Sequence, residues 1–395
     1  MNEELPLEVE FVDRVDAIPP EAWAACFPPP LEGRFWYQTL HASGLEDQFQ
    51  FLYGVLRLGG RIVGIAPCFR HDVPLTLVAP APVAFLLRGA ALAYPPAGRL
   101  RTFFVGSPCA DEGTIGLAPG HGLATVIEPL ARAVGERARA LGASLVVFKD
   151  FNAGDVAALR RAPGFTLFPS YPGAVVRLPA PDKDAYYRSL AHKQRYNLQK
   201  KLRRSTAAFA LDTQVIARPS DGELNDILAL FLQTYERGRT KFERLNRSFF
   251  AAVREQPEAR FIVQREHATG RMVAFMLVFV AGRRVINKFI GLDYAVARTH
   301  HLYFRLFDAA LDFAYAAGAG EIQSGQTGYS AKLELGHHLV PLVNAVRHRH
   351  PVVHAVFSAV VRRITWASLD DDLAGWLRAH PERDWRIPAG AARSE

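Results

Sequence analysis

A basic segment near the middle of the chain has the residue types that bind polyanions. Six lysines and arginines lie within residues 192–204, and no aspartate or glutamate interrupts them. In a helix, like charges spaced four residues apart repel by about 0.2–0.5 kcal/mol per pair, so a merely solvated helix usually intersperses acidic residues. A bound anion would offset this repulsion, and a solvated face is the alternative interpretation. The residues expected to bind an anionic ligand are Lys193, Arg195, Asn197, Lys200 and Arg204.

Hydrophobic periodicity predicts the elements that must position this segment. In the first half we expect a strand over 7–12, a hairpin over 49–69, a strand over 101–106, a helix over 123–141, a strand over 144–148, a short helix over 155–161 and a strand region over 165–178. In the second half we expect the long basic helix over 182–205, a strand over 209–216, a helix over 220–235, a hairpin over 261–280, a strand over 285–290, a helix over 302–317 and a strand over 321–324. The apolar stripe of the basic helix is expected to contain Tyr187, Ala191, Leu198 and Leu202.

The two halves share the order of these elements and some local sequence. Gly60-Arg61 and Gly270-Arg271 begin the return strand of a hairpin, and Gly142 and Gly318 each end a helix before a strand. This shared order predicts a tandem duplication with an α/β (α+β) fold, in which each half is a mixed, mostly antiparallel sheet flanked by helices. Two unrelated α/β domains are the alternative. The prolines over 179–181 cannot continue a sheet, which predicts domains 1–180 and 181–350 and a helical extension and tail over 351–395.

Length and composition place the chain among globular proteins with two domains. Its 395 residues exceed one ordinary hydrophobic core, and 49% hydrophobic with 22% charged residues is typical of a soluble protein. The first residues lack the apolar segment of a secretory signal, and no run of about eighteen apolar residues predicts a membrane span. The three cysteines have no C-x-x-C spacing and are expected to be reduced thiols. We therefore expect a cytoplasmic protein.

Three stretches of the second half have motif-like spacing. Residues 189–198 read SLAHKQRYNL, residues 270–293 run from GRMVAF to GLD, and residues 329–336 read YSAKLELG. In this order they resemble the K-x-R-x-N helix, the G-x-x-V-A-F hairpin and the K-x-x-x-G segment of the GNAT acetyltransferase superfamily. The resemblance is to its tandem FemAB-like branch, which includes peptidoglycan-bridge aminoacyltransferases and BioF2-like acetyltransferase domains. It covers residues 182–348 well and the first half more loosely, and it implies tandem GNAT-like domains.

The resemblance also implies a phosphate-binding loop before a helix, and the two halves differ there. Members that use CoA carry a Q/R-x-x-G-x-G/A loop whose free backbone N–H groups hold phosphate. At the corresponding place the second half has Arg298-Thr299-His300-His301, without glycine. The first half has a G-x-G sequence at the start of its helix, which predicts cofactor binding there, with an ordinary Gly-rich turn as the alternative. The residues of this predicted cofactor site are Gly120, His121 and Gly122.

Amine acylation, the reaction implied by the resemblance, needs orientation of the reactants, polarisation of a carbonyl and a route for the amine proton. Lys332 matches the family's lysine and suits stabilisation of a phosphate or an oxyanion. Lys288 lies in an apolar strand, where an unpaired charge is costly unless the side chain faces solvent. The expected catalytic residues are Lys332, Lys288, Tyr329 and Asp293, and Gln326 and Thr327 are expected to contact the substrate.

Together these features predict an acyltransferase. Its donor would be an acyl-CoA or an aminoacyl-tRNA, and its acceptor an amine of an anionic small molecule, a peptide or a cell-envelope precursor. The formal net charge of +8 fits such partners. No metal is expected, because the histidines between residues 337 and 354 lack a carboxylate or cysteine to complete a site. The amphipathic helix over 352–364 is expected to pack on its own domain rather than on a membrane surface. A non-catalytic protein that binds a nucleotide-linked or peptide ligand is the alternative.

Overall fold

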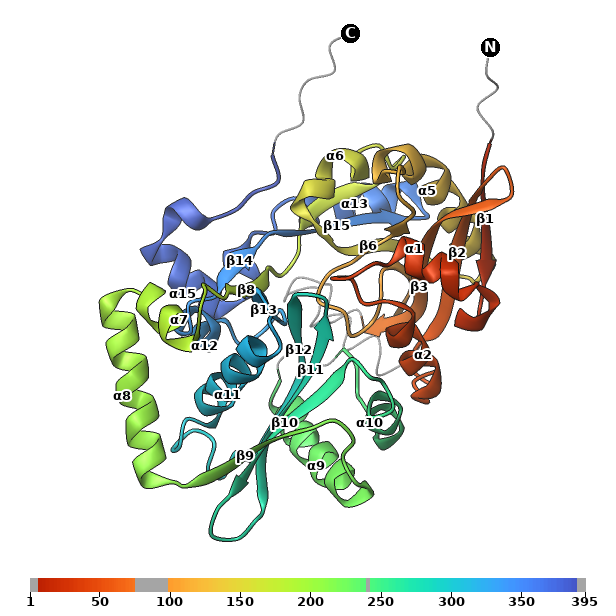
Figure 1. The fold of residues 1–395 in the computed structure, drawn as a ribbon. Coiled ribbons are helices and arrows are strands. Elements are labelled where there is room, and N and C mark those ends of the chain that lie inside the picture. The colour runs from red at the N-terminus through yellow and green to blue at the C-terminus, as the bar shows by residue number, and fades with distance from the viewer. Residues whose placement is uncertain (1–5, 75–98, 239–241, 389–395) are drawn as a thin grey trace, which may run out of the picture. The chain divides into compact units, whose positions relative to one another are not determined.

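The computed structural model describes residues 6–74, 99–238 and 242–388, drawn as a ribbon in Figure 1. The chain divides into two compact units. The first comprises residues 1–28, 46–172 and 341–395, and the second comprises residues 29–45 and 173–340. Both units are discontinuous in sequence, whereas the expected domains 1–180, 181–350 and 351–395 are contiguous.

The first unit is built on an eight-stranded sheet. Its strands lie in the order β1 (Leu7–Val12), β2 (Gln50–Leu58), β3 (Arg61–Pro74), β4 (Arg99–Val105), β6 (Leu145–Asn152), β15 (Leu342–His348) and β7 (Thr166–Pro169), and β5 (Gly116–Leu117) pairs with β3. β4 and β6 run parallel, and the other strand pairs described in this sheet are antiparallel. The helices of this unit are α1 (Pro20–Cys26), α5 (Leu123–Ala140), α6 (Val156–Leu159), α13 (Pro351–Val361), α14 (Trp366–Leu369) and α15 (Asp371–Ala379).

The second unit is built on a seven-stranded sheet. Its strands lie in the order β14 (His338–Val340), β8 (Gly173–Arg177), β13 (Glu321–Ser324), β12 (Arg284–Leu292), β11 (Met272–Ala281), β10 (Ala259–Glu266) and β9 (Leu211–Ile216). β12 and β13 run parallel, and the other described pairs are antiparallel. Its helices are α2 (Arg34–Ala42), α7 (Lys183–Ser189), α8 (His192–Ala208), α9 (Asp221–Arg237), α10 (Arg247–Val253), α11 (Leu302–Ala316) and α12 (Tyr329–Glu334).

Helices cover both faces of the second sheet. On one face, α11 buries Leu306 and Phe307 in a core that also contains Met276 of β11. On the other face, Phe231 of α9 contacts the ring of Phe289 of β12 edge-on, with ring centroids 5.9 Å apart. Burial of large apolar side chains on both faces explains why β11 reads as a continuous hydrophobic run rather than an alternating one.

The two sheets have the same strand order, and this confirms the predicted fold class. β1, β2, β3, β4 and β6 correspond to β9, β10, β11, β12 and β13, and the one parallel pair described in each sheet falls at the same place. The helix between these parallel strands ends at a left-handed glycine in both units: φ is +70° at Gly142 after α5 and +68° at Gly318 after α11. A residue with a Cβ is disfavoured at such a φ, so the matching glycines of the sequence have a physical reason.

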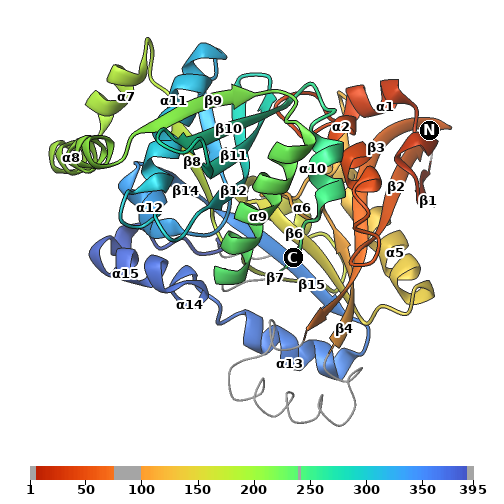
Figure 2. The ribbon, with the colours of Figure 1, turned by 90° about the horizontal axis from the view of Figure 1, so that it is seen from below.

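The halves exchange one strand each, which the sequence did not predict. β15 follows the second half in sequence but lies between β6 and β7 of the first sheet, where Figure 2 also shows it. β8 follows the first half in sequence but lies between β13 and β14 of the second sheet. The predicted strand region over 165–178 is therefore two strands that belong to different sheets.

The predicted helix over 182–205 is also wrong as a single element. It is broken into α7 and α8, because Leu190 and Ala191 have extended ψ angles of 148° and 143°. The carboxylate of Asp182 caps α7 by accepting a hydrogen bond from the N–H of Ala185 at 2.8 Å. Within residues 6–74, 99–238 and 242–388, no helix combines the length and the apolar character that crossing a bilayer requires.

Candidate functional site

The parallel strands β12 and β13 separate in the middle of the second sheet. Their pairing begins at Arg284 and Glu321 and ends at Asn287 and Ser324, after which β12 continues to Leu292 while the chain leaves β13. Loops beyond the carboxyl ends of parallel strands are where open α/β sheets usually bind ligands. The loop before α12 follows β13, and the turns before α11 follow β12 (Figure 1). We take this opening as the candidate site.

A β-bulge in β12 lies directly at this opening. Opposite β11, Phe289 pairs with Leu277 and Asn287 pairs with Val278, so Lys288 is the extra residue. A bulge leaves its extra residue outside the regular ladder and re-aims the side chain. Asn287 and Lys288 are consequently both buried, at 6% and 8% exposure, although they are neighbours in one strand.

Lys288 has an internal partner that sequence reasoning missed. Its Nζ lies 2.5 Å from Oε1 of Glu32 and 4.5 Å from the ring centroid of Trp36 at the start of the second unit. A charge that is paired with an opposite charge tolerates burial, so this ion pair accounts for the lysine without a bound ligand. Glu32 is far from Lys288 in sequence, and the residues around it match no motif. The sequence alone therefore did not indicate this partner.

A chain of buried polar contacts lies at the end of β13. Oγ of Ser324 is 3.0 Å from Nε2 of His337, and Nδ1 of His337 is 2.9 Å from the carbonyl oxygen of Lys332. A carbonyl can only accept, so Nδ1 carries the proton and Nε2 accepts from the Ser324 hydroxyl. Burial, followed by the charge of Lys332, lowers the pKa of His337 to about 3. The imidazole is therefore neutral at physiological pH.

The segment that follows β13 brings four predicted site residues together. Gly328, with φ +68°, directly precedes α12, whose first residue Tyr329 is fully buried. Lys332 is also buried, and its ammonium group donates to the carbonyl of Gly325 at the start of the loop. Gln326 and Thr327 lie between them, half-buried and exposed respectively. The loop and helix thus hold one ammonium group and several polar groups beside the opening.

Asp293, also predicted as catalytic, is engaged in local structure. Its carboxylate accepts from Nη1 of Arg271 on the β10–β11 hairpin and from the N–H of Ala295, the latter at 3.0 Å. These contacts fix the turn that leaves β12, and Asp293 is only 6% exposed. Both carboxylate oxygens of Asp293 already accept hydrogen bonds that hold this turn, so we infer a structural role.

The basic helix α8 packs one face against the helices that follow β12 and β13. Nε2 of Gln194 donates to the carbonyls of Leu333 and Glu334 in α12 at 3.0 and 2.9 Å. Lys201 pairs with Glu334 at 2.5 Å and lies 3.7 Å above the ring of Phe304 in α11. The hydroxyl of Ser205 donates to the carbonyl of His300 just before α11. The inner stripe is therefore Gln194, Leu198, Lys201 and Ser205.

This stripe corrects the predicted one. Leu198 is fully buried as expected, but Ala191 is exposed, Leu202 is half-buried and Tyr187 belongs to α7. The outer face keeps its predicted character, because its basic and amide side chains are exposed or half-buried. Its predicted ligand-binding residues are Lys193, Asn197 and Arg204, which are exposed, and Arg195 and Lys200, which are half-buried.

The start of α11 takes a left-handed turn without glycine. His301 has φ 48° and precedes the first helical residue. The N–H of Leu302 donates to Ala297 at 3.0 Å, and the N–H groups of Phe304 and Arg305 donate to His301 at 3.0 and 3.2 Å. Most backbone donors of this turn therefore have internal acceptors, so phosphate binding here would rely mainly on side chains.

The predicted cofactor residues Gly120, His121 and Gly122 lie in the first unit, before α5. Gly120 has φ +86°, and the carbonyl of Gly122 accepts from both the N–H and the hydroxyl of Thr125, at 3.1 and 2.8 Å. Both glycines are exposed, and a Cβ at either would meet nothing within 4 Å. Close contact with other parts of the protein therefore does not explain why glycine occupies positions 120 and 122. Their role in cofactor binding stays a prediction.

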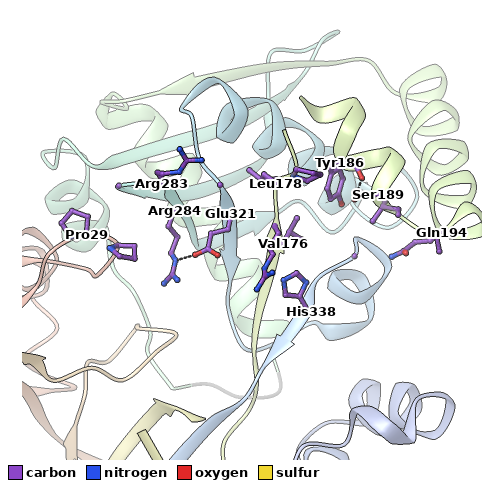
Figure 3. A pocket seen from close by; sticks show the side chains of 18 residues that line it. Pro29, Val176, Leu178, Tyr186, Ser189, Gln194, Arg283, Arg284, Glu321 and His338 are labelled. Atoms are coloured by element: carbon purple, nitrogen blue, oxygen red, sulfur yellow. Dashed lines mark hydrogen bonds and ion pairs between the residues drawn. The ribbon is translucent and has the colours of Figure 1, made fainter. Parts of the chain in front are cut away.

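A large pocket of about 1050 Å³ lies in the second unit at the amino-terminal ends of β12 and β13 (Figure 3). Sequence reasoning missed it, because its walls come from six separate segments of the chain. The residues that line it include Pro29, Val176, Arg177, Leu178, Tyr186, Leu190, Arg283, Arg284, Glu321 and His338. Among the described residues, no group of three or more His, Cys, Asp or Glu side chains could hold a metal ion.

Comparison with known proteins agrees with this architecture. Residues 192–332 match the family described as an acetyltransferase (GNAT) domain. The crystal structure of FemX is similar, with a TM-score of 0.56 and 12% identity over 89% of this chain and 100% of that chain. A tandem GNAT protein from the clavulanic acid biosynthesis pathway has a TM-score of 0.52 and 14% identity, covering 87% and 99% of the two chains. A conserved protein of unknown function from Bacteroides thetaiotaomicron has a TM-score of 0.53 and 11% identity, covering 87% and 100%.

At these identities the similar structures establish the fold alone. Among curated proteins, none matches the sequence significantly.

Proposed function

We propose that this chain, a tandem-GNAT-fold protein whose residues 192–332 form an acetyltransferase (GNAT) domain, transfers an acyl or aminoacyl group from a phosphate-bearing donor to an amine. One observation carries the proposal: the basic helix α8 is docked on α11 and α12, the helices that follow the two strands of the opening. We propose that a donor whose phosphates lie on α8 reaches the opening between β12 and β13 with its acyl end. An anion-binding face beside a polar opening is what such a transfer needs.

The polar groups at the opening suit the chemistry of amine acylation. The carbonyl of the donor gains negative charge as the amine attacks, and prepositioned donors stabilise this charge. We assign this role to the ammonium group of Lys332, together with the backbone of the β12 bulge at Lys288. To Tyr329, the buried first residue of α12, we assign the role of proton donor to the leaving group. We assign Lys288 and Asp293 to structure, since their charged groups already have partners.

The outer face of α8 suits a long polyanion. Its seventeen residues span about 25 Å at 1.5 Å per residue. The occupied N–H groups before α11 argue against a backbone cradle for a pyrophosphate, so side chains would hold the donor. Both acyl-CoA and aminoacyl-tRNA offer the required phosphates. We take a CoA ester as the first donor to test, because residues 192–332 match an acetyltransferase (GNAT) domain.

A second candidate function has a specific observation in its favour. Two of the four residues expected to act in catalysis, Lys288 and Asp293, have carboxylate or guanidinium partners that explain their burial. A protein with fewer groups available for chemistry could use the same fold to bind a nucleotide-linked or peptide ligand without turnover.

The experiment that decides between them combines binding with single turnover. The protein is incubated with radiolabelled acetyl-CoA or aminoacyl-tRNA and a set of amines, and transfer is compared for the parent and for Lys332→Met. The proposal expects transfer from one of the two acyl donors. In Lys332→Met the rate of transfer should fall by at least about 10²-fold, as it does when an oxyanion loses one hydrogen-bond donor. Donor affinity should stay unchanged. Saturable binding of a donor without transfer to any amine would favour the binding protein.

A further inference from the structure

We infer that the pocket at the amino-terminal ends of β12 and β13 binds a small ligand with an anionic head group and an apolar body. The pocket is distinct from the proposed acyl-transfer opening, which lies at the other end of the same strands. It is formed wholly within the second unit by segments that include the start of β12, the start of β13 and the end of β8. This inference does not depend on the proposed function.

The charges of the pocket favour an anion. Arg177 and Arg283 are exposed, and within the described part of the chain neither guanidinium has a hydrogen bond or an ion pair. The one carboxylate in the lining, that of Glu321, is neutralised by Arg284 at 2.6 Å (Figure 3). Two positive charges therefore remain without a counter-ion. Planar guanidinium groups bind carboxylate and phosphate in a bidentate manner, which makes these anions the expected head groups.

Apart from the imidazole of His338, the other polar side chains of the lining are already used within the protein. The hydroxyl of Ser189 donates to the carbonyl of Tyr186 at 2.7 Å, and the amide of Gln194 donates to α12. The hydroxyl of Tyr186 donates to the carbonyl of Leu335 at 2.5 Å. A neutral polar ligand would therefore find few partners beyond the two arginines and the imidazole of His338. An anionic head group is the chemistry that these two donors select.

The remaining wall of the pocket is apolar. It is formed by Val176, Leu178, Tyr186, Leu190 and the prolines at positions 29 and 30. In Figure 3, Tyr186 lies on one side of Leu178, and the Arg284–Glu321 pair lies on the other. A volume of about 1050 Å³ slightly exceeds the usual range for small-molecule sites, so the pocket accommodates an apolar body as well as a head group. Contact with this wall removes apolar ligand surface from water, which makes binding more favourable.

Isothermal titration with octyl phosphate and octanoate tests this inference on the full chain. We expect saturable binding of at least one of these ligands, and much weaker binding of inorganic phosphate and of octyl glucoside. The double variant Arg177→Ala/Arg283→Ala should weaken the affinity by about tenfold or more, because charge-assisted hydrogen bonds are lost. The matched control Arg378→Ala removes an exposed arginine of the first unit and should leave the affinity unchanged.

Both arginines are exposed, so the double variant is expected to fold, which circular dichroism checks. Leu178→Ala tests the apolar wall. It should weaken the binding of octyl phosphate but not the binding of inorganic phosphate. The inference is overturned by absence of saturable binding of either octyl ligand, by equal affinity for octyl glucoside, or by unchanged affinity in the double arginine variant. Equal affinity for inorganic phosphate and octyl phosphate would also overturn it, since the apolar body would then contribute nothing.

Discussion

Oγ of Ser324 lies 3.0 Å from Nε2 of His337, and both side chains are buried. The imidazole thereby joins the end of β13 to the carbonyl of Lys332 in α12, which Nδ1 contacts at 2.9 Å. Both ring nitrogens are satisfied only in the neutral tautomer with the proton on Nδ1. The position of the α12 lysine thus depends on a histidine that must stay uncharged.

Replacing this histidine should change both stability and its pH dependence. In the parent protein, His337 binds a proton in the unfolded chain below its ordinary pKa of about 6.5, but in the folded protein only near a pKa of about 3. The unfolded state therefore binds more protons in that window, and the free energy of unfolding falls as pH falls, by at most about 1.4 kcal/mol per pH unit. His337→Phe should remove this component of the slope.

The variant should also lose about 1–3 kcal/mol at pH 7.5, because the Ser324 hydroxyl loses its partner and the Lys332 carbonyl keeps only the backbone N–H of residue 337. Urea unfolding between pH 5 and 7.5 measures both effects. His380→Phe, which removes an exposed imidazole, serves as the control and should keep the parent slope. If His337→Phe kept the full pH dependence of the parent's unfolding free energy, a group other than His337 would be responsible for it.

The Lys288–Glu32 pair gives a second prediction. Only 1% of the Lys288 side chain and 15% of the Glu32 side chain are exposed. Glu32→Gln removes the counter-charge of a buried ammonium group, so we expect a loss of about 3 kcal/mol in the free energy of unfolding. The exposed pair of Arg218 and Glu255 is the matched comparison, and Glu255→Gln should cost less than about 1 kcal/mol.

Chemical denaturation of a double-mutant cycle separates charge from packing. Glu32→Leu combined with Lys288→Met replaces the pair by apolar side chains, and most of the lost stability should return. Equal losses for the single and double variants would mean that the shape of this region, rather than the ion pair, determines its stability.

Local patterns in the sequence were sufficient for most elements of both sheets. Gly142 and Gly318 end their helices because both require a left-handed φ, and the hairpins follow from alternating apolar runs. The exchanged strands β8 and β15 could not be predicted. A strand of five to seven residues shows which of its faces is buried, but nothing in it specifies which sheet it joins.

The candidate site was predictable to a similar degree. Lys332, Tyr329 and the basic face of α8 follow from motifs that are continuous in sequence. His337, Ser324 and Glu32 act through contacts between separate segments, so only the fold reveals their partners. The pocket was hidden for the same reason, since one of its two unpaired arginines is in β8 and the other is in the turn before β12.

The outer face of α8 should bind the donor by electrostatics. Lys193 and Arg204 are exposed near opposite ends of the helix, about 16 Å apart at 1.5 Å per residue. If the donor is aminoacyl-tRNA, Lys193→Ala/Arg204→Ala should reduce the slope of log affinity against log salt by about 2, one for each lost phosphate contact. Fluorescence anisotropy with labelled tRNA measures this slope.

A CoA ester, whose phosphates gather at one end, should be affected by only one of the two substitutions. Lys201→Met is the control, because this lysine faces inward to Glu334 and should alter stability without changing the salt slope. If the Lys193/Arg204 double variant kept the parent's salt slope and affinity for both donors, the basic face would be a solvated surface that does not bind the donor.

The strand exchange makes a prediction about which parts of the chain unfold together. Ala345 of β15 is fully buried between Phe148 of β6 and Leu167 of β7, so Ala345→Asp places an unpaired charge inside the first sheet. Hydrogen–deuterium exchange should then accelerate in β6 and β7, although β15 is adjacent in sequence to β14. The reciprocal change, Val175→Asp in β8, should accelerate exchange in β13 and β14, which flank it in the second sheet. If each substitution instead loosened the strands nearest to it in sequence, β7 for Val175 and β14 for Ala345, the exchanged arrangement would be wrong.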